Sequence, residues 1–303
     1  MKRTDVVTAG LLSLLACAAS AQAPEAAGKP AAPPDPIAEI VANMRKAEAG
    51  LKSVQIEMRT KGVQPSGLVV TSKGVLRVLR GTQSTAGAAA PTQLHTVVEV
   101  EFEGGMKSRT ETAQTEDGIV MAQSDPVVGD LLVRFDRKVT ADLEWAGEVL
   151  ERADLPGMKD RRVSAPLGST MVAELQRHFL LAVDPRPQRQ GEAGTWLAGK
   201  RKPGLDTDDP DLPVADRVEL FVRAADHALL EVVLWQGETQ LQQLVVDKLQ
   251  LGVELPPKVF TVDARGGKVR DVREVPAMWE QIEQVLKQAE SKSQDGVVRP
   301  SKR

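Results

Sequence analysis

One heptapeptide has the spacing of a phosphate-binding loop. Residues 194–200 read Gly-Thr-Trp-Leu-Ala-Gly-Lys, which places two glycines and a lysine as such a loop requires. The next residue in a true phosphate loop is Ser or Thr, whose hydroxyl holds Mg²⁺, but Arg201 stands there. Residues 195–199 also have the composition of a β-strand. We therefore interpret the spacing as a coincidence and predict no nucleotide cofactor.

An acidic cluster could in principle attract Ca²⁺. An EF-hand loop that began at Asp206 would need Gly at its sixth position and Glu at its twelfth, where the chain has Asp211 and Arg217. We expect a solvated loop and no metal site. The members of the cluster are Asp206, Asp208, Asp209 and Asp211.

Catalytic side chains are equally hard to assemble from the sequence. His95, His178 and His227 are scattered and lack the spacing of a zinc site. No Gly-x-Ser-x-Gly motif occurs, and Cys17 is the only cysteine. We predict no catalytic residue and expect the chain not to be an enzyme, although residues distant in sequence can converge in a fold.

The N-terminus predicts export. Lys2 and Arg3 precede an apolar stretch over residues 6–19, and Ala21-Gln22-Ala23 has the small residues of a cleavage site. Residues 1–23 are therefore expected to be a signal peptide and the mature protein to be periplasmic. Residues 13–17 also resemble a lipobox, so Cys17 could instead be acylated and anchor an outer-membrane lipoprotein.

Composition excludes several kinds of partner. The 303 residues carry 39 basic and 42 acidic side chains, a net charge of −3, so no polybasic surface for nucleic acid is expected. Only 3% of residues are aromatic and Tyr is absent, which disfavours base stacking. We expect a monomer that does not bind nucleic acid.

The start of the folded domain follows an Ala/Pro-rich linker over residues 24–34. Asp35-Pro36 can cap and begin a helix, and Gly50 stands where it should end. Its apolar residues share one stripe at helical spacing. They are Ile37, Ile40, Val41, Met44 and Leu51.

The pattern then alternates between apolar and polar residues, as in β-strands with one buried face. Alternation predicts strands over residues 54–60 and 68–80, again from residue 95, and after a hairpin at Glu116-Asp117-Gly118. The apolar members of the first and third runs are Val54, Ile56 and Met58, and Val98, Val100 and Phe102.

Helical spacing returns in the middle of the chain and near its end. Residues 140–152 and 169–183 carry apolar stripes that include Leu143 in the first segment and Leu175 and Phe179 in the second. A further helix is predicted over residues 273–290, and residues 291–303 are expected to form a disordered tail.

Residues 217–262 predict the most extensive sheet. Three apolar runs separated by short turns indicate an antiparallel meander, and a last strand is expected at residues 259–262 after Pro256-Pro257. Each of the first two runs is expected to place its alternating apolar residues on one face. These residues are Val218, Leu220 and Val222, and Leu230, Val232 and Leu234.

Three segments together resemble the periplasmic lipoprotein carriers of the LolA/LolB-like superfamily. They are the first helix and strand (residues 37–60), the hairpin at Glu116-Asp117-Gly118, and the closing run with Leu255-Pro256-Pro257, Phe260 and Gly266-Gly267. The resemblance implies an α+β, mainly β fold: a curved antiparallel sheet forming a half-open β-barrel around a hydrophobic cavity, with amphipathic helices as a lid. Residues 35–272 would form this domain, with a helical insert over residues 140–183. That insert, residues 81–93 and the C-terminal helix are additional to the family pattern, and no arginine is assigned to the family's lid latch.

The resemblance implies a non-enzymatic carrier that binds lipid or lipoprotein acyl chains for outer-membrane lipoprotein sorting. Such a site needs no catalytic group, because removing acyl chains from water is favourable by itself. An envelope sensory module that binds a membrane-anchored inner- or outer-membrane partner is the alternative, and a hydrolase with an unrecognised site is the third. The expected lipid-contacting residues are Val54, Ile56, Met58, Val98, Val100, Phe102, Leu143, Leu175, Phe179, Val218, Leu220, Val222, Leu230, Val232 and Leu234.

Overall fold

The computed structural model describes residues 35–63, 67–81, 92–127, 129–139, 167–186, 189, 191–204, 215–262 and 268–272. The predicted signal peptide, Cys17, the linker, the first half of the helical insert with Leu143, the acidic cluster, the C-terminal helix and the tail lie outside these residues.

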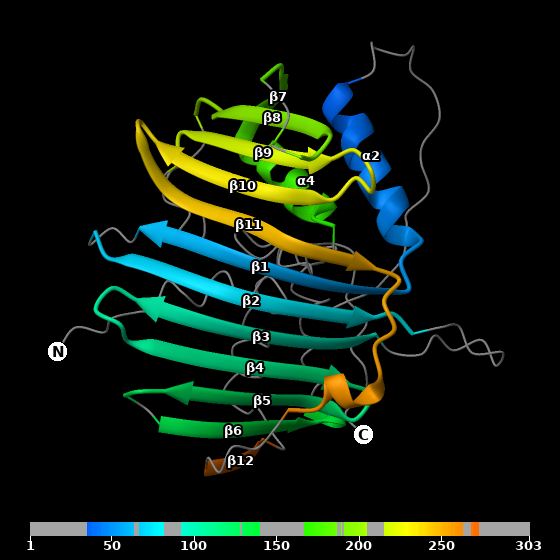
Figure 1. The fold of residues 1–303 in the computed structure, drawn as a ribbon, viewed down its shortest axis with the longest axis vertical. Helices are drawn as coiled ribbons and strands as arrows, with labels where there is room; N and C mark the ends of the chain where they lie inside the picture. The colour runs from blue at the N-terminus through cyan, green and yellow to red at the C-terminus, as the bar shows by residue number, and fades with distance from the viewer. Residues whose placement is uncertain are drawn as a thin grey trace, which may run out of the picture.

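The described chain forms one open sheet of twelve strands with helices on one face (Figure 1). The strands run in the order β12-β6-β5-β4-β3-β2-β1-β11-β10-β9-β8-β7. All neighbours pair antiparallel except β12 and β6, which pair parallel. This confirms the α+β, mainly β class. The strands are β1 Ser53–Val63, β2 Val69–Leu79, β3 Gln93–Phe102, β4 Lys107–Thr115, β5 Gly118–Asp125, β6 Gly129–Asp136, β7 Phe179–Asp184, β8 Gly194–Arg201, β9 Arg217–Arg223, β10 Leu229–Gln236, β11 Thr239–Leu251 and β12 Lys268–Val272.

The meander predicted over residues 217–251 is confirmed as β9, β10 and β11. The strand predicted at residues 259–262 is wrong, because a 3-10 helix, η2 (Pro257–Phe260), occupies that stretch and packs against β3 and β4. Pro257 has the fixed φ that suits the first position of a helix and lacks the N–H that a strand would need. The apolar side chain that suggested a strand, Phe260, is instead buried by η2.

Helix α2 (Pro36–Ala49) has the boundaries that the sequence indicates. The Asp35 carboxylate accepts a hydrogen bond of 2.9 Å from the N–H of Ile37, and Gly50 follows the last turn. Helix α4 (Ser169–His178) is shorter than the predicted span to residue 183, because Phe179 begins β7. The residues 179–183 alternate as a strand does, and the ladder to β8 supplies their backbone hydrogen bonds.

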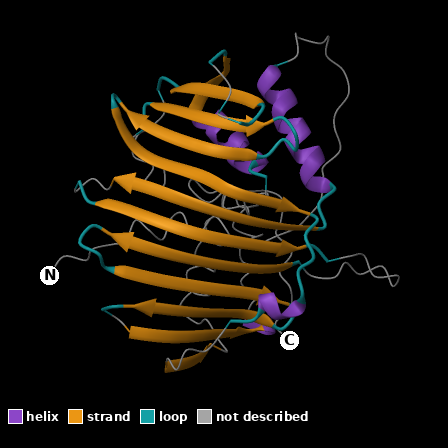
Figure 2. Ribbon diagram, in the orientation of Figure 1, coloured by secondary structure: helices purple, strands orange, loops and turns teal. Residues whose placement is uncertain are grey.

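Both helices lie at the β7–β11 end of the sheet (Figure 2). They bury the apolar residues Ile37, Val41 and Met44 of α2 and Val172 of α4 against strands β7 to β10. We call this side of the sheet the helix face. The sheet residues buried beneath the helices are Phe179, Leu197, Val218, Leu220, Val222, Leu229, Val232 and Leu234.

The strand register shows which residues in the rest of the sheet lie on the helix face. Leu244 of β11 packs into the layer under the helices and stands opposite Thr60 of β1, and directly opposed residues share a face. Alternation then places Val54, Ile56 and Met58 on the helix face too. Their neighbours on β2 and β3 include Leu76, Val78, Leu94 and Val98.

A bulge near the start of β10 separates two adjacent leucines into different clusters. The register of β10 against β9 shifts between Leu229 and Glu231, so both Leu229 and Leu230 occupy the space of one residue. Leu229 packs with the helix layer, whereas Leu230 is buried with Leu167, Phe221 and Ala228. Leu230 thus packs in a separate cluster from Val232 and Leu234, together with Ala47 and Leu51.

One buried carboxylate joins the two helices. Glu48, in the last turn of α2, accepts hydrogen bonds from the N–H of Leu167 at 3.0 Å, from the N–H of Ser169 at 3.1 Å and from the Ser169 hydroxyl. Helix α4 has no side-chain cap of its own at Gly168, so Glu48 satisfies the amides at its start. A negative charge at a helix N-terminus is also favoured by the helix dipole.

The same junction is attached to the sheet. Arg80, which follows β2, donates to the backbone carbonyl of Glu48 at 2.7 Å. The N–H of Leu229 in β10 donates to the carbonyl of Leu167 at 2.8 Å. The C-terminal end of α2 and the N-terminal end of α4 are thus held to each other and to the sheet at one point.

We expect Glu48→Ala to lower the free energy of unfolding by about 2–3 kcal/mol, because it leaves two buried amides and a hydroxyl without an acceptor. Urea denaturation followed by circular dichroism measures this change. Glu39→Ala is the matched control on an exposed position of α2 and should shift the same quantity by less than about 1 kcal/mol. Equal effects of the two substitutions would contradict this role of Glu48.

Candidate functional site

The helix face is the candidate site for an apolar ligand. Of the residues expected to contact lipid, those on β7, β9 and β10 other than Leu230 lie in the layer between the sheet and the helices, and Leu175 of α4 packs at its edge. Val54 and Ile56 are buried in a second group, with Met58 beside them. Val98, Val100 and Phe102 lie on the same face of β3. The sheet thus brings these candidates together on one face.

The two apolar groups differ in the described elements that contribute to them. Residues of α2 and α4 belong to the first group, whereas the described members of the second come from strands β1, β2, β3 and β11. The second group is also buried, with Val54, Ile56, Leu76 and Leu94 each at most 8% exposed, and it continues the apolar face toward β3. The second group comprises Val54, Ile56, Leu76 and Leu94, with Met58, Val78, Val246 and Leu249 packed against it.

Gly74 leaves an interruption in this second region. It stands between Met58 and Val98 across neighbouring strands, so its missing side chain leaves a low point in an otherwise apolar row. A β-carbon built there would lie 3.5 Å from the Met58 side chain and 3.7 Å from that of Val98, which are ordinary contact distances. A side chain at this position would therefore lie between those of Met58 and Val98 without a close contact at its β-carbon.

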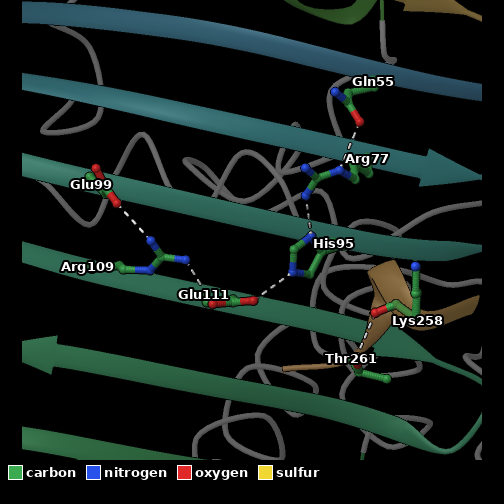
Figure 3. Close-up of polar contacts among 8 residues, drawn as sticks. All are labelled: Gln55, Arg77, His95, Glu99, Arg109, Glu111, Lys258 and Thr261. Carbon is green, nitrogen blue, oxygen red and sulfur yellow. Dashed lines mark hydrogen bonds and ion pairs between the residues drawn. The ribbon is translucent and has the colours of Figure 1, made fainter. Parts of the chain in front are cut away.

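The opposite side of β1–β4, which we call the polar face, carries a chain of hydrogen bonds (Figure 3). Arg77 donates to the Gln55 side chain at 2.9 Å and to Nδ1 of His95 at 3.0 Å. Nε2 of His95 lies 3.1 Å from a carboxylate oxygen of Glu111. Arg109 then donates to Glu111 at 3.1 Å and to Glu99 at 2.8 Å.

This chain of contacts fixes the tautomer of His95. A guanidinium can only donate, so Nδ1 of His95 must accept from Arg77. Nε2 therefore carries the proton and donates it to Glu111, and the imidazole is neutral. Both ring nitrogens are engaged and the side chain is only 5% exposed, so no lone pair is free for general-base catalysis.

The pKa values of the central pair follow from their surroundings. Burial lowers the pKa of His95 below 6.5, and this effect outweighs the opposing influence of Glu111. Burial alone would raise the pKa of Glu111, but hydrogen bonds from His95 and Arg109 prevail and lower it below 4.5. At neutral pH the pair is a neutral imidazole beside a carboxylate.

The sequence interpretation missed this arrangement because it considered His95 only as a metal ligand. Register was the missing signal, since Arg77, His95 and Gln55 stand directly opposite one another on adjacent strands. Among the described residues, no group of three or more acidic, His or Cys side chains could hold a metal ion. Residues 194–200 form most of strand β8, in agreement with the interpretation of the phosphate-loop spacing as a coincidence.

Over β8–β10, arginine and tryptophan side chains cover the polar face. Arginines stack there on aromatic rings, with Arg186 over Trp196 and Arg217 over Trp235, each at 4.8 Å from the ring centroid. Glu219 accepts from both arginines. Hydrogen bonds to Glu219 and Asp184 raise the pKa of Arg186, so the guanidinium stays charged. The region over β1–β4 is open, because a groove lies there.

Stability should fall with acidification through His95. Its native pKa lies below the unfolded value of 6.5, so the unfolded state binds more protons between the two values, and stability is lost as pH falls through 6.5 toward the native pKa. We expect a slope of up to about 1.4 kcal/mol per pH unit in this window. Glu111 titrates at lower pH and does not contribute there.

Urea denaturation between pH 7.5 and 5 measures this slope. His95→Gln, which can still accept from Arg77 and donate to Glu111, should flatten it. His227→Asn is the control, because His227 has φ 55° and Asn tolerates that conformation. An unchanged slope in His95→Gln would show that another group titrates.

No protein-family model matches the chain, and no curated protein matches it in sequence. Solved structures that are similar to it include the Pseudomonas aeruginosa MucA/MucB complex, with 12% identity and a TM-score of 0.39 over 76% of this chain and 62% of that chain. The chain therefore spans less than two thirds of that protein's length.

Two further similar structures cover almost all of their own chains. The Mycobacterium tuberculosis lipoprotein LppX has 15% identity and a TM-score of 0.34 over 72% of this chain and 99% of that one. A LolA superfamily protein from Nitrosomonas europaea has 10% identity and a TM-score of 0.25 over 75% and 97% of the two chains. Among the described residues, no helix has both the length and the apolar character to span a membrane.

Proposed function

We propose that this protein is a non-catalytic carrier of the cell envelope that binds the acyl chain of a lipid or lipoprotein on its helix face. The expected signal peptide would deliver it to the periplasm. Its partners would be the acylated cargo and an envelope protein or membrane that receives it.

The observation that supports this proposal is the apolar layer on the helix face, which extends past the described helices. Helices α2 and α4 contribute to the group over β7–β11, while the described members of the second group come from β1–β3 and β11 and its core residues are buried. An acyl chain laid along the second group would extend the layer that α2 and α4 begin. It would meet Ile56, Leu76 and Leu94 and the low point at Gly74.

The energetics require no catalytic group. Each methylene removed from water contributes about 0.8 kcal/mol, so roughly ten methylenes correspond to about 8 kcal/mol, which is the micromolar range before ordering costs. Because such contacts are not directional, one face could accept acyl chains of several lengths.

The attachment of the helices suggests how the layer would open. Glu48, Arg80 and Leu229 hold the C-terminal end of α2 and the N-terminal end of α4. Ile37, near the N-terminal end of α2, packs in the apolar cluster between the helices and the sheet. We infer that α2 pivots about the Glu48 junction and admits an acyl chain from its N-terminal end.

Gly74→Val tests the proposed path of the acyl chain. Because the new side chain fills the low point between Met58 and Val98, we expect it to weaken displacement of a fluorescent fatty-acid probe about fivefold or more, while the free energy of unfolding stays within about 1 kcal/mol of the native protein.

The matched control is Thr71→Val, which adds an apolar residue to the opposite, exposed face of the same strand and should leave probe binding unchanged. Failure of the native protein to bind any fatty-acid probe would refute the carrier function. Normal binding by Gly74→Val would instead place the acyl chain elsewhere.

A further inference from the structure

An open groove of about 500 Å³ lies on the polar face over β1–β4, on the side of the sheet away from the helices. Val75 and Val97 stand directly opposite each other in the register of β2 and β3 and form an apolar floor. Charged side chains surround the two valines. They are Glu57, Lys73, Arg77, Glu99, Arg109, Glu111 and Asp247, with the neutral His95 beside them.

Every carboxylate that lines the groove already has a cation. Arg109 binds both Glu99 and Glu111. Lys248 lies 3.5 Å from Glu57, and Arg59 lies 3.0 Å from Asp247. A cationic ligand would therefore have to displace an existing ion pair.

Two lining cations have no carboxylate among the described residues. Arg77 donates only to neutral acceptors, the Gln55 amide oxygen and Nδ1 of His95. Lys73 is exposed and has no ion pair in the described part of the chain. Both side chains lie on the same face of β2, one on either side of Val75. Arg109 is shared by Glu99 and Glu111, so with Lys248 and Arg59 counted beside the lining residues, five cations face four carboxylates, a net charge of +1. The two cations that have no carboxylate flank the apolar floor.

We propose that this groove binds a carboxylate with a short branched apolar body. The carboxylate would pair with Arg77, whose planar guanidinium matches it, and Lys73 would approach from the other side of Val75. The apolar body would rest on Val75 and Val97. The site is separate from the acyl-binding function, because it lies on the opposite face of the sheet.

The dimensions suit such a ligand. Lys73 and Arg77 are four residues apart on one strand, about 13 Å between α-carbons, so their long side chains can close on a small molecule between them. The volume falls in the range of small-molecule sites, roughly 300–1,000 Å³. Arg77 is also held in place by Gln55 and His95, which lowers the entropy lost when it pairs with a ligand.

Titration of the full chain with isovalerate, followed by ¹⁵N–¹H NMR of the arginine Nε–H signals, tests the proposal. Isovalerate should shift the Arg77 signal saturably, while the neutral isovaleramide should not. We expect Arg77→Gln to weaken binding about tenfold and Lys73→Gln about threefold. Lys61→Gln, an exposed lysine of β1 outside the groove, should leave binding unchanged.

Absence of isovalerate binding, equal binding of acid and amide, or equal affinity in Lys73→Gln and Lys61→Gln would each overturn the proposal. Because Lys73 is exposed, its substitution remains decisive even if Arg77→Gln fails to fold.

Discussion

The arrangement of helices over the sheet depends on the buried carboxylate of Glu48. It replaces the missing cap of α4 and binds two amides and a hydroxyl that α2 would otherwise never meet. A buried carboxylate is costly unless its lone pairs are satisfied, so this contact requires one relative position of the two helices. Hydrogen bonds from Arg80 and Leu229 attach this junction to the sheet. The apolar packing of α2 and α4 against the sheet adds to this junction.

The period of two along each strand gives the sheet two chemically different surfaces. On one side, the side chains of β1 and its neighbour β11 are mainly apolar, and the helices pack on that same side. On the other side, the same strands present Arg77, His95, Glu111 and Arg109, whose hydrogen bonds run across four strands. An apolar ligand and an anionic ligand could therefore be bound on opposite sides of one sheet without competing.

Local sequence signals predicted much of this fold. Asp35 and Gly50 delimited α2, alternation located most strands, and Glu116-Asp117-Gly118 marked a hairpin. The errors arose where long-range interactions, which a short stretch of sequence does not reveal, decide the structure. Apolar residues at 179–183 fit both helical and strand spacing, and pairing with β8 decides between them. Glu48 meets Leu167, 119 residues away, so no spacing rule could have joined them.

Native mass spectrometry of the protein purified from the cell envelope tests the central claim most directly. If the helix face carries an acyl chain, the intact protein should show an added mass of a lipid or acylated fragment, which disappears when the protein is denatured in organic solvent. The released molecule should then appear in the extract at close to one per chain. An unmodified mass under both conditions, with no lipid in the extract, would contradict the carrier function.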